Sequence, residues 1–177
     1  MIKGGAGRRY ARAVFELASQ KGDYDQWLQD LTEIRDFLSY SKIAAIIQNP
    51  EVPFEKKKNI IDAGLGDLDQ LRRNFAYILV ERRRSAAIDN IVAEFQSLVN
   101  ERRGVAVADV VTAIPLNDKD AKLVAEQLSA LTGKKVTLRQ SVDSSIIGGI
   151  VAKIGDKLIN GSVADRLARM RERLAQA

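Results

Sequence analysis

The sequence predicts an α+β protein, in which an N-terminal six-helix bundle is followed by a small mixed α/β domain. Two observations carry this prediction. Up to Gly104, apolar residues recur at the three- and four-residue spacing of amphipathic helices, with helix-starting or helix-stopping residues between the runs. After Gly104, β-branched and alternating segments indicate strands interleaved with helices. We therefore expect a bundle over residues 1–104 and the α/β domain over residues 105–177.

The six expected helices are separated by residues that start or stop helices. Gly22 ends the first, because glycine readily adopts the left-handed conformation that terminates a helix. Pro50 stops the third, since proline disfavours helical geometry in the residue before it. The first helix is expected at about residues 5–20, the second begins after its cap Asp23, and the third runs from Ser41 to just before Pro50. The fourth has Pro53 in its first turn and ends at Gly64. The fifth spans about residues 67–83, and the sixth begins at its cap Ser85 and ends at Gly104.

The C-terminal domain begins with residues 105–114, whose β-branched and alanine side chains are typical of a strand covered on both sides. A helix follows from Asn117 to Gly133, with acidic residues in its first turn where the helix dipole favours them. Its expected inward residues are Ala121, Val124, Leu128 and Leu131.

Two further strands are expected at residues 135–142 and 146–154. The second contains Gly148 and Gly149, which indicate a bulge or a close backbone contact. Ser162 and Asp165 form a capping box for a last helix. Its apolar stripe consists of Val163, Leu167, Met170 and Leu174.

The chain contains no histidine and no cysteine. This composition excludes a Ser-His-Asp relay, a thiol nucleophile and a disulfide, and it removes the usual ligands of zinc, haem and iron–sulfur clusters. The segment Gly133–Lys134–Lys135 lacks the earlier glycine and the Ser or Thr of a phosphate loop. We therefore expect no catalytic residue, no cofactor and no metal.

The net charge of +5 permits an anionic partner. Arg82, Arg83 and Arg84, beside Arg72 and Arg73, form the densest basic run. A solvated helix end explains them, and an RNA-binding helical module of antitermination type is the alternative function. No apolar run approaches the roughly 20 residues of a membrane span, and the N-terminus lacks a signal-peptide core, so a soluble cytosolic product is expected.

The first and fifth helices carry unusually wide apolar arcs. In the first helix, Ala6, Tyr10, Ala13 and Leu17 occupy one sector, and the adjoining sector holds Ala11, Val14, Phe15 and Ala18. In the fifth, the expected core stripe is Leu68, Leu71, Phe75, Ile78 and Leu79, widened by Ala76 and Val80. Such arcs indicate either deep burial, which is the default, or an exposed groove that accepts an amphipathic helix.

The opening "RRYARAVFELA" at 8–18 and the tail "VVTAIPL…LTGKKVTLRQSVDSSIIGGIVAKIGDKLINGSV" resemble the delta subunit family of bacterial rotary ATP synthase, which includes the mitochondrial oligomycin-sensitivity-conferring protein. The resemblance covers essentially the whole chain, and residues 142–162 are its most specific part. Ala152 departs from it, because a larger aliphatic residue is expected there.

The resemblance implies a non-catalytic stator subunit of the peripheral stalk, which joins the catalytic head to the b-subunit stalk and resists rotation. The implied partners are the N-terminal helix of an alpha subunit and the C-terminal end of the b-subunit coiled coil, with no nucleic acid. The membrane is reached only through the complex, at the cytoplasmic face of the cell membrane. Carried over by position, the groove residues are Tyr10, Ala13, Leu17, Asn74 and Ile78.

Overall fold

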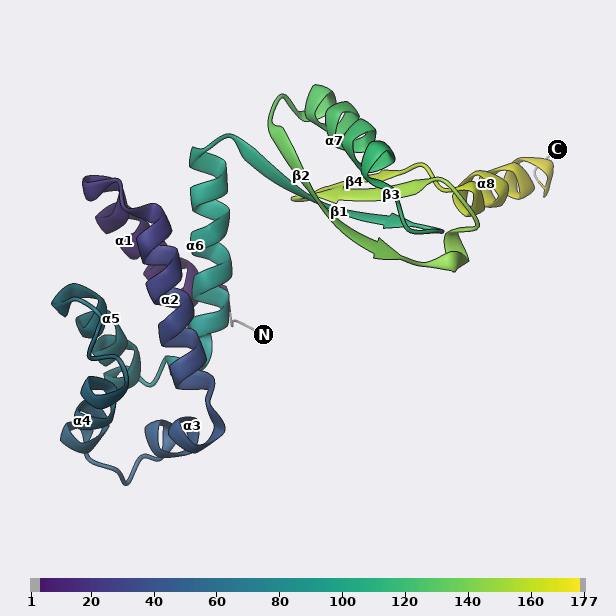
Figure 1. Ribbon diagram of the computed structural model, residues 1–177. Helices are drawn as coiled ribbons and strands as arrows, with labels where there is room; N and C mark the ends of the chain where they lie inside the picture. Colours follow the sequence, from purple (N-terminus) through teal and green to yellow (C-terminus); the bar gives the residue numbers. More distant parts are fainter. Residues whose placement is uncertain (1–3, 176–177) are drawn as a thin grey trace. The chain divides into compact units, whose positions relative to one another are not determined.

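The computed structural model describes the backbone of residues 4–175 and the side chains of residues 7–174 (Figure 1). The chain divides into two compact units, residues 1–99 and residues 100–177. Helices build the first unit, whereas the second combines helices with a four-stranded sheet, so the expected α+β class is confirmed. Within the described residues, no helix is long and apolar enough to cross a lipid bilayer.

Aspartate side chains near two helix starts of the first unit behave differently. The Asp69 carboxylate accepts a hydrogen bond from the backbone N–H of Arg72 (3.0 Å), so the fifth helix starts at Gln70 rather than near residue 67. Asp23 precedes the second helix but makes no capping bond, because its carboxylate pairs with Arg72 instead (2.8 Å). The helices are α1 (Gly4–Lys21), α2 (Tyr24–Ser39), α3 (Ser41–Gln48), α4 (Phe54–Gly64), α5 (Gln70–Glu81), the short η1 (Ser85–Ala87) and α6 (Ile88–Arg102).

Two other expected helix starts differ in detail. Pro53 is the N-cap of α4 and not part of its first turn. Ser85 opens η1, a 3-10 turn that leads into α6, and so it is not the cap of α6 itself. Each residue nevertheless stands where a non-helical segment ends and the next helical segment begins.

The core of the first unit is an apolar cluster drawn from most of its helices. Helix α2 contributes Trp27, Leu31, Ile34 and Leu38, the face expected from the sequence. Helix α6 contributes Ile88, Ile91, Phe95 and Val99. On α5 the expected core stripe is partly wrong, because Leu71 and Ile78 are 38% and 44% exposed while Ala76 and Val80 are buried.

The second unit is a mixed sheet with the strand order β2-β1-β3-β4. Strand β1 runs parallel to β2 and antiparallel to β3, and β3 is antiparallel to β4. The parallel pair needs a crossover, which α7 supplies (Figure 1). The elements are β1 (Val105–Thr112), α7 (Asp118–Thr132), β2 (Lys135–Val142), η2 (Ser144–Ile146), β3 (Ile150–Ile154), β4 (Lys157–Asn160) and α8 (Val163–Ala175).

Helix α7 has the ends that the sequence predicts. The Asn117 side chain accepts a hydrogen bond from the backbone N–H of Asp120 (2.8 Å), and Gly133 ends the helix at φ 67°. Its inward face buries Leu128, but Leu131 is 71% exposed, so the expectation of an inward Leu131 is wrong. Leu131 is in the last turn of α7 and is not part of the apolar cluster of this unit.

The sheet is buried on one face only. Ala108, Val110 and Ala152 are fully buried on that face, with Leu128 of α7 and Val136 in the same cluster. On the opposite face, Asp109 is exposed and pairs with Arg139 of β2 (3.4 Å). The expectation that β1 is covered on both sides is therefore wrong, because a single crossover helix covers a single face.

Gly149 marks a close backbone contact, as expected, although strand β3 begins only at Ile150. Its φ is 77°, and a Cβ at this position would lie 2.3 Å from the carbonyl oxygen of Gly161. The start of α8 is half of the expected capping box. Ser162 Oγ accepts from the N–H of Asp165 (3.2 Å), but the N–H of Ser162 donates to Asn160 Oδ1 (3.1 Å).

Candidate functional site

Helix α1 divides its apolar residues between the core and the surface. Ala11, Val14 and Ala18 are at most 1% exposed. Ala13 and Leu17 are exposed, and Tyr10 is half-buried. The division follows helical geometry, because Tyr10, Ala13 and Leu17 are spaced i, i+3 and i+7 and so lie on one face.

Helix α5 presents a second row with the same spacing. Leu71, Asn74 and Ile78 are all exposed, whereas Phe75, Ala76, Leu79 and Val80 face the core. Asn74 Oδ1 accepts a hydrogen bond from Gln70 Nε2 (3.2 Å). Leu71 is a further candidate on this face, although the sequence predicts it to be part of the core stripe. Its position one helical turn before Asn74 was the available signal.

Tyr10 connects the two helices. Its ring packs edge-on against the ring of Phe75, with centroids 6.3 Å apart and an interplanar angle of 74°. Tyr10 and Ala13 also line a cavity of about 490 Å³, to which Arg82 contributes from the end of α5. Arg82 follows Ile78 by four residues and therefore extends the row of α5. The cavity therefore joins the row of α1 to the C-terminal end of α5.

We call the two rows together the α1–α5 face, defined as Tyr10, Ala13, Leu17, Leu71, Asn74 and Ile78. The structure brings Tyr10 and Ala13 together at the cavity. Leu17, Asn74 and Ile78 are exposed on their helices but do not line it. The exposed side chains of this face extend beyond the cavity, so they could contact a ligand that is longer than the cavity. The face is suited to binding and not to acid–base catalysis.

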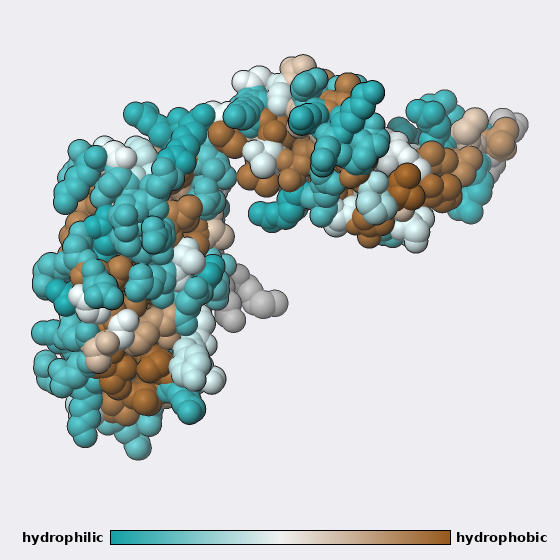
Figure 2. Space-filling model, viewed as in Figure 1, coloured by the Kyte–Doolittle hydropathy of each residue, from teal (hydrophilic) through white to brown (hydrophobic). Residues whose placement is uncertain are grey.

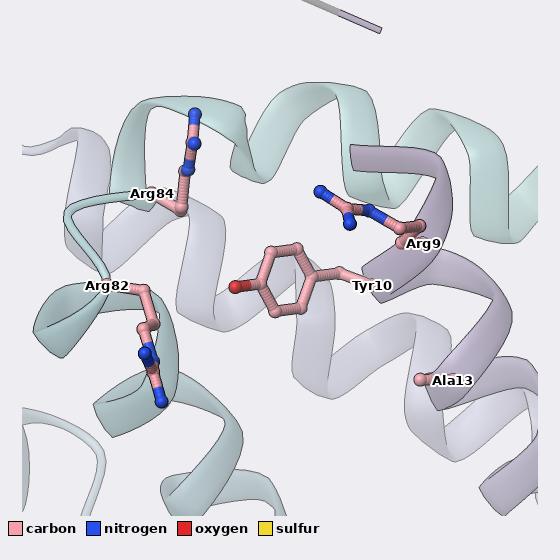
Figure 3. A pocket seen from close by; sticks show the side chains of 5 residues that line it. All are labelled: Arg9, Tyr10, Ala13, Arg82 and Arg84. Carbon is pink, nitrogen blue, oxygen red and sulfur yellow. The ribbon is translucent and has the colours of Figure 1, made fainter. Parts of the chain in front are cut away.

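Three arginines surround Tyr10 in this cavity. Figure 3 shows Arg9 on one side of the Tyr10 ring and Arg82 and Arg84 on the side toward which the hydroxyl points. All three arginines are exposed, and no carboxylate among the described residues forms an ion pair with them. Arg82, Arg83 and Arg84 thus form a solvated helix end, whereas Arg72 of the same basic run is buried, and tertiary structure adds Arg9 to the exposed group.

The titratable groups with displaced pKa values belong to the scaffold. Burial opposes ionisation of Asp69, but the Arg72 N–H and guanidinium outweigh it and lower the pKa of Asp69. The hydroxyl and N–H of Ser145 lower the pKa of Asp143, beside η2. A hydrogen bond to Asp62 raises the pKa of Tyr77. No group of three or more potential metal ligands occurs among the described residues.

Helix α8 carries a second exposed apolar row. Val163, Leu167, Met170 and Leu174 are 38%, 53%, 56% and 80% exposed, and Figure 2 shows hydrophobic side chains along this helix in brown. The sequence predicts this stripe, and the other described elements of the second unit leave it exposed. Ile147, in the preceding loop, is 64% exposed at φ 68°, a conformation that β-branched residues rarely adopt.

The comparisons with known proteins agree over nearly the whole chain. A family model described as the ATP synthase delta (OSCP) subunit matches residues 6–174. A protein named ATP synthase subunit delta from Dehalococcoides mccartyi is 36% identical over 168 residues, covering 95% of this chain and 93% of the relative. One of the same name from Symbiobacterium thermophilum is 36% identical over 179 residues, covering 100% and 96%.

A solved structure shows the same fold. A chain in the cryo-EM structure of the Toxoplasma gondii mitochondrial ATP synthase hexamer matches with a TM-score of 0.68 at 23% identity, covering 99% of this chain and 98% of that one. Together with the sequence matches, this confirms the resemblance found in the sequence.

Proposed function

The chain belongs to the ATP synthase delta (OSCP) subunit family, and from this premise we propose that its α1–α5 face binds the N-terminal helix of an alpha subunit. As a delta subunit it is a non-catalytic stator component of the peripheral stalk and part of the ATP synthase complex. The exposed face supports the proposal, because Ala13, Leu17 and Ile78 are surface residues of a kind that a docked helix would cover.

The geometry of the face suits a helix. Each row has the i, i+3, i+7 spacing with which one helix lies along another. Ala13 is small, so the backbone of a docked helix approaches α1 closely at that point. Tyr10, at one end of the α1 row, holds that row to α5 because its ring packs against Phe75. An amphipathic partner helix would bury its apolar side on both rows at once.

The mechanical task also favours an apolar joint. A stator resists torque between infrequent assembly events, so its contacts must dissociate slowly. Nanomolar affinity corresponds to about 12 kcal/mol. A helix that buries about 800 Å² on each partner reaches this only with a well-packed apolar centre. Exposed ion pairs contribute under about 1 kcal/mol each and would not suffice alone.

The test uses the full chain and a labelled peptide of about 25 residues from the alpha-subunit N-terminus of the same organism. We expect Ala13→Asp and Ile78→Asp each to weaken binding at least 30-fold, about 2 kcal/mol, because the docked helix would desolvate the new carboxylate. The melting temperature should stay near that of the wild type, since both positions are exposed.

Ala93→Asp is the matched control, because Ala93 is exposed on α6 and outside the α1–α5 face. It should bind the peptide like the wild type. If Ala13→Asp and Ala93→Asp bind equally well, the α1–α5 face is not the docking site.

For the second unit, we propose that the exposed row of α8 engages the C-terminal end of the b-subunit coiled coil, at the cytoplasmic face of the cell membrane. The support is the uncovered apolar stripe, which a coiled-coil end would cover. We expect Leu167→Asp to abolish capture of a soluble b fragment that contains the C-terminal end. Ala168 lies on the other side of α8, so the Ala168→Asp variant should capture the b fragment as the wild type does. Equal capture by both variants would exclude this row.

A further inference from the structure

The cavity at one end of the α1–α5 face holds positive charge that the chain does not balance. Arg9, Arg82 and Arg84 line it around Tyr10, and within the described residues none of the three has a carboxylate partner (Figure 3). In Figure 3 the Arg82 and Arg84 side chains extend in opposite directions on either side of the Tyr10 hydroxyl, so the three arginines give this end of the face a spread of positive charge. An acidic ligand would balance that charge.

The backbone fixes two of these arginines in place. The N–H of Arg82 donates to Ile78 O (3.0 Å), and the N–H of Arg84 donates to Leu79 O (2.7 Å). Arg83 between them has φ 54°, which turns the chain sharply at the end of α5. The carbonyl end of α5 accounts for a preference for cations at Arg82 and Arg84. It does not account for Arg9, which belongs to the second turn of α1.

The apolar rows alone would leave the position of a docked helix ambiguous. A helix with apolar residues at i, i+3 and i+7 presents nearly the same stripe after a shift of one turn, about 5.4 Å. A charged contact at one end distinguishes the two positions, because the shifted helix would leave its acidic group away from the arginines. Complementary charges commonly fix the register of an interface in this way.

We infer that the helix bound by the α1–α5 face carries a carboxylate that reaches Arg9, Arg82 and Arg84, and that this contact fixes the register of the bound helix. The inference rests on the proposed function and specifies the chemistry of its partner. The apolar rows supply most of the affinity. The arginines supply the register and a part of the affinity that depends on salt.

The test compares full-length Arg82→Gln/Arg84→Gln with the wild type for binding of the same alpha-subunit peptide. At about 50 mM salt we expect the variant to bind about three- to tenfold more weakly, as for two ion pairs near a surface. At about 1 M salt, where the Debye length is about 3 Å, the difference should vanish. Lys42→Gln/Lys56→Gln removes equal charge from exposed positions outside the cavity and should bind like the wild type.

A second peptide, with its acidic residues changed to their amides, identifies the partner group. It should bind the wild type as weakly as the original peptide binds the arginine variant. The arginine variant should bind the amide peptide with the same affinity as it binds the original peptide, because the two changes remove the same contact. If the losses of binding free energy from the peptide change and from the arginine change add up, the inference is wrong. It is also wrong if the alpha-subunit segment that binds this face contains no acidic residue.

The two proposals fail in different ways. If Ala13→Asp abolishes binding while the arginine variant binds like the wild type at low salt, only the acidic contact is wrong. If Ala13→Asp leaves binding intact, the docking face is wrong and the acidic contact falls with it.

Discussion

Arg72 of α5 lies in the interior of the helical unit with its guanidinium Nε paired to Asp30 of α2, and the two residues are only 7% and 3% exposed. Asp23 and Asp69 pair with the remaining guanidinium nitrogens. The guanidinium also lies over the ring of Trp27, 4.8 Å from its centroid. One side chain thereby joins the start of α2, its second turn and the start of α5.

Replacing Arg72 with methionine should destabilise the first unit by about 3–5 kcal/mol, the usual cost of breaking a buried ion pair from one side. Methionine fills similar volume, but it leaves the Asp30 carboxylate buried without a cation. Thermal or urea unfolding followed by Trp27 emission measures the change. Arg35→Met is the control, since Arg35 pairs only with the adjacent, exposed Asp36 (2.7 Å). A loss for Arg72→Met as small as that of the control would show that the pair contributes little.

The Tyr77 hydroxyl donates to Asp62 Oδ1, and this bond, with burial and the charge of Asp62, raises the pKa of Tyr77 above its ordinary value of 10.0. The folded state therefore holds the phenolic proton more tightly than the unfolded state. Its stabilisation is complete below pH 10 and is lost as the pH rises through the higher folded pKa. Wild type should exceed Tyr77→Phe in melting temperature at pH 8, and the gap should narrow above pH 10.

Tyr40→Phe is the control for that experiment, because the Tyr40 side chain is 58% exposed. It should follow the wild type across the whole series. A gap between wild type and Tyr77→Phe that is constant from pH 8 to 11 would contradict the role of the Asp62 bond.

The ammonium of Lys57 is buried against the end of α3, where it donates to the carbonyl oxygens of Ile47 (2.8 Å) and Asn49 (2.7 Å). Lys57→Met keeps the aliphatic chain but leaves both carbonyls without this donor. We expect a loss of about 1.5–3 kcal/mol, measured by urea unfolding with Trp27 emission. Lys56→Met, at the neighbouring exposed position, should change stability by less than about 0.5 kcal/mol. Equal effects would mean that the two bonds add nothing.

Gly149 and Gly155 allow two reasons for a glycine in the second unit to be distinguished, namely a positive φ angle and a lack of space for a Cβ atom. Both have positive φ, 77° and 57°, but a Cβ would strike the Gly161 backbone only at Gly149. Gly155→Ala should cost about 1–2 kcal/mol from conformation alone, and Gly149→Ala substantially more because two backbone segments must separate. Every aromatic residue precedes position 100. Far-UV circular dichroism should therefore detect the loss while the Trp27 emission melt stays unchanged. Similar losses at both glycines would contradict the steric argument.

Local chemistry accounts for the parts of the fold that the sequence predicted well. The ends of α7 at Asn117 and Gly133 depend on bonds within a few residues, so short-range patterns suffice to place them. The same holds for the division of α1 into two sectors, which follows from the angle of 100° per residue. The predicted groove residues Ala13, Leu17, Asn74 and Ile78 are all exposed, as a groove requires, while their partner remains a proposal.

The predictions of burial are wrong where contacts between residues far apart in the sequence determine whether a side chain is buried. The sequence places Arg72 beside a solvated helix end, yet Arg72 is buried and pairs with a carboxylate 49 residues earlier in the chain. Leu71 and Leu131 were expected inside, but burial of an apolar residue requires a neighbouring element that reaches it. No local pattern specifies how far such an element extends.

The amino-acid order by itself determined most of the helix and strand segments, although not strand β4, together with the absence of histidine and cysteine chemistry and the family resemblance, because each is carried by residue type and short spacing. Tertiary structure alone decided which apolar sector meets water, and it alone gathered Arg9 with Arg82 and Arg84 around Tyr10. The physical reason is that burial and charge balance are sums over all spatial neighbours, and residues more than 70 positions apart become neighbours only when the helices pack.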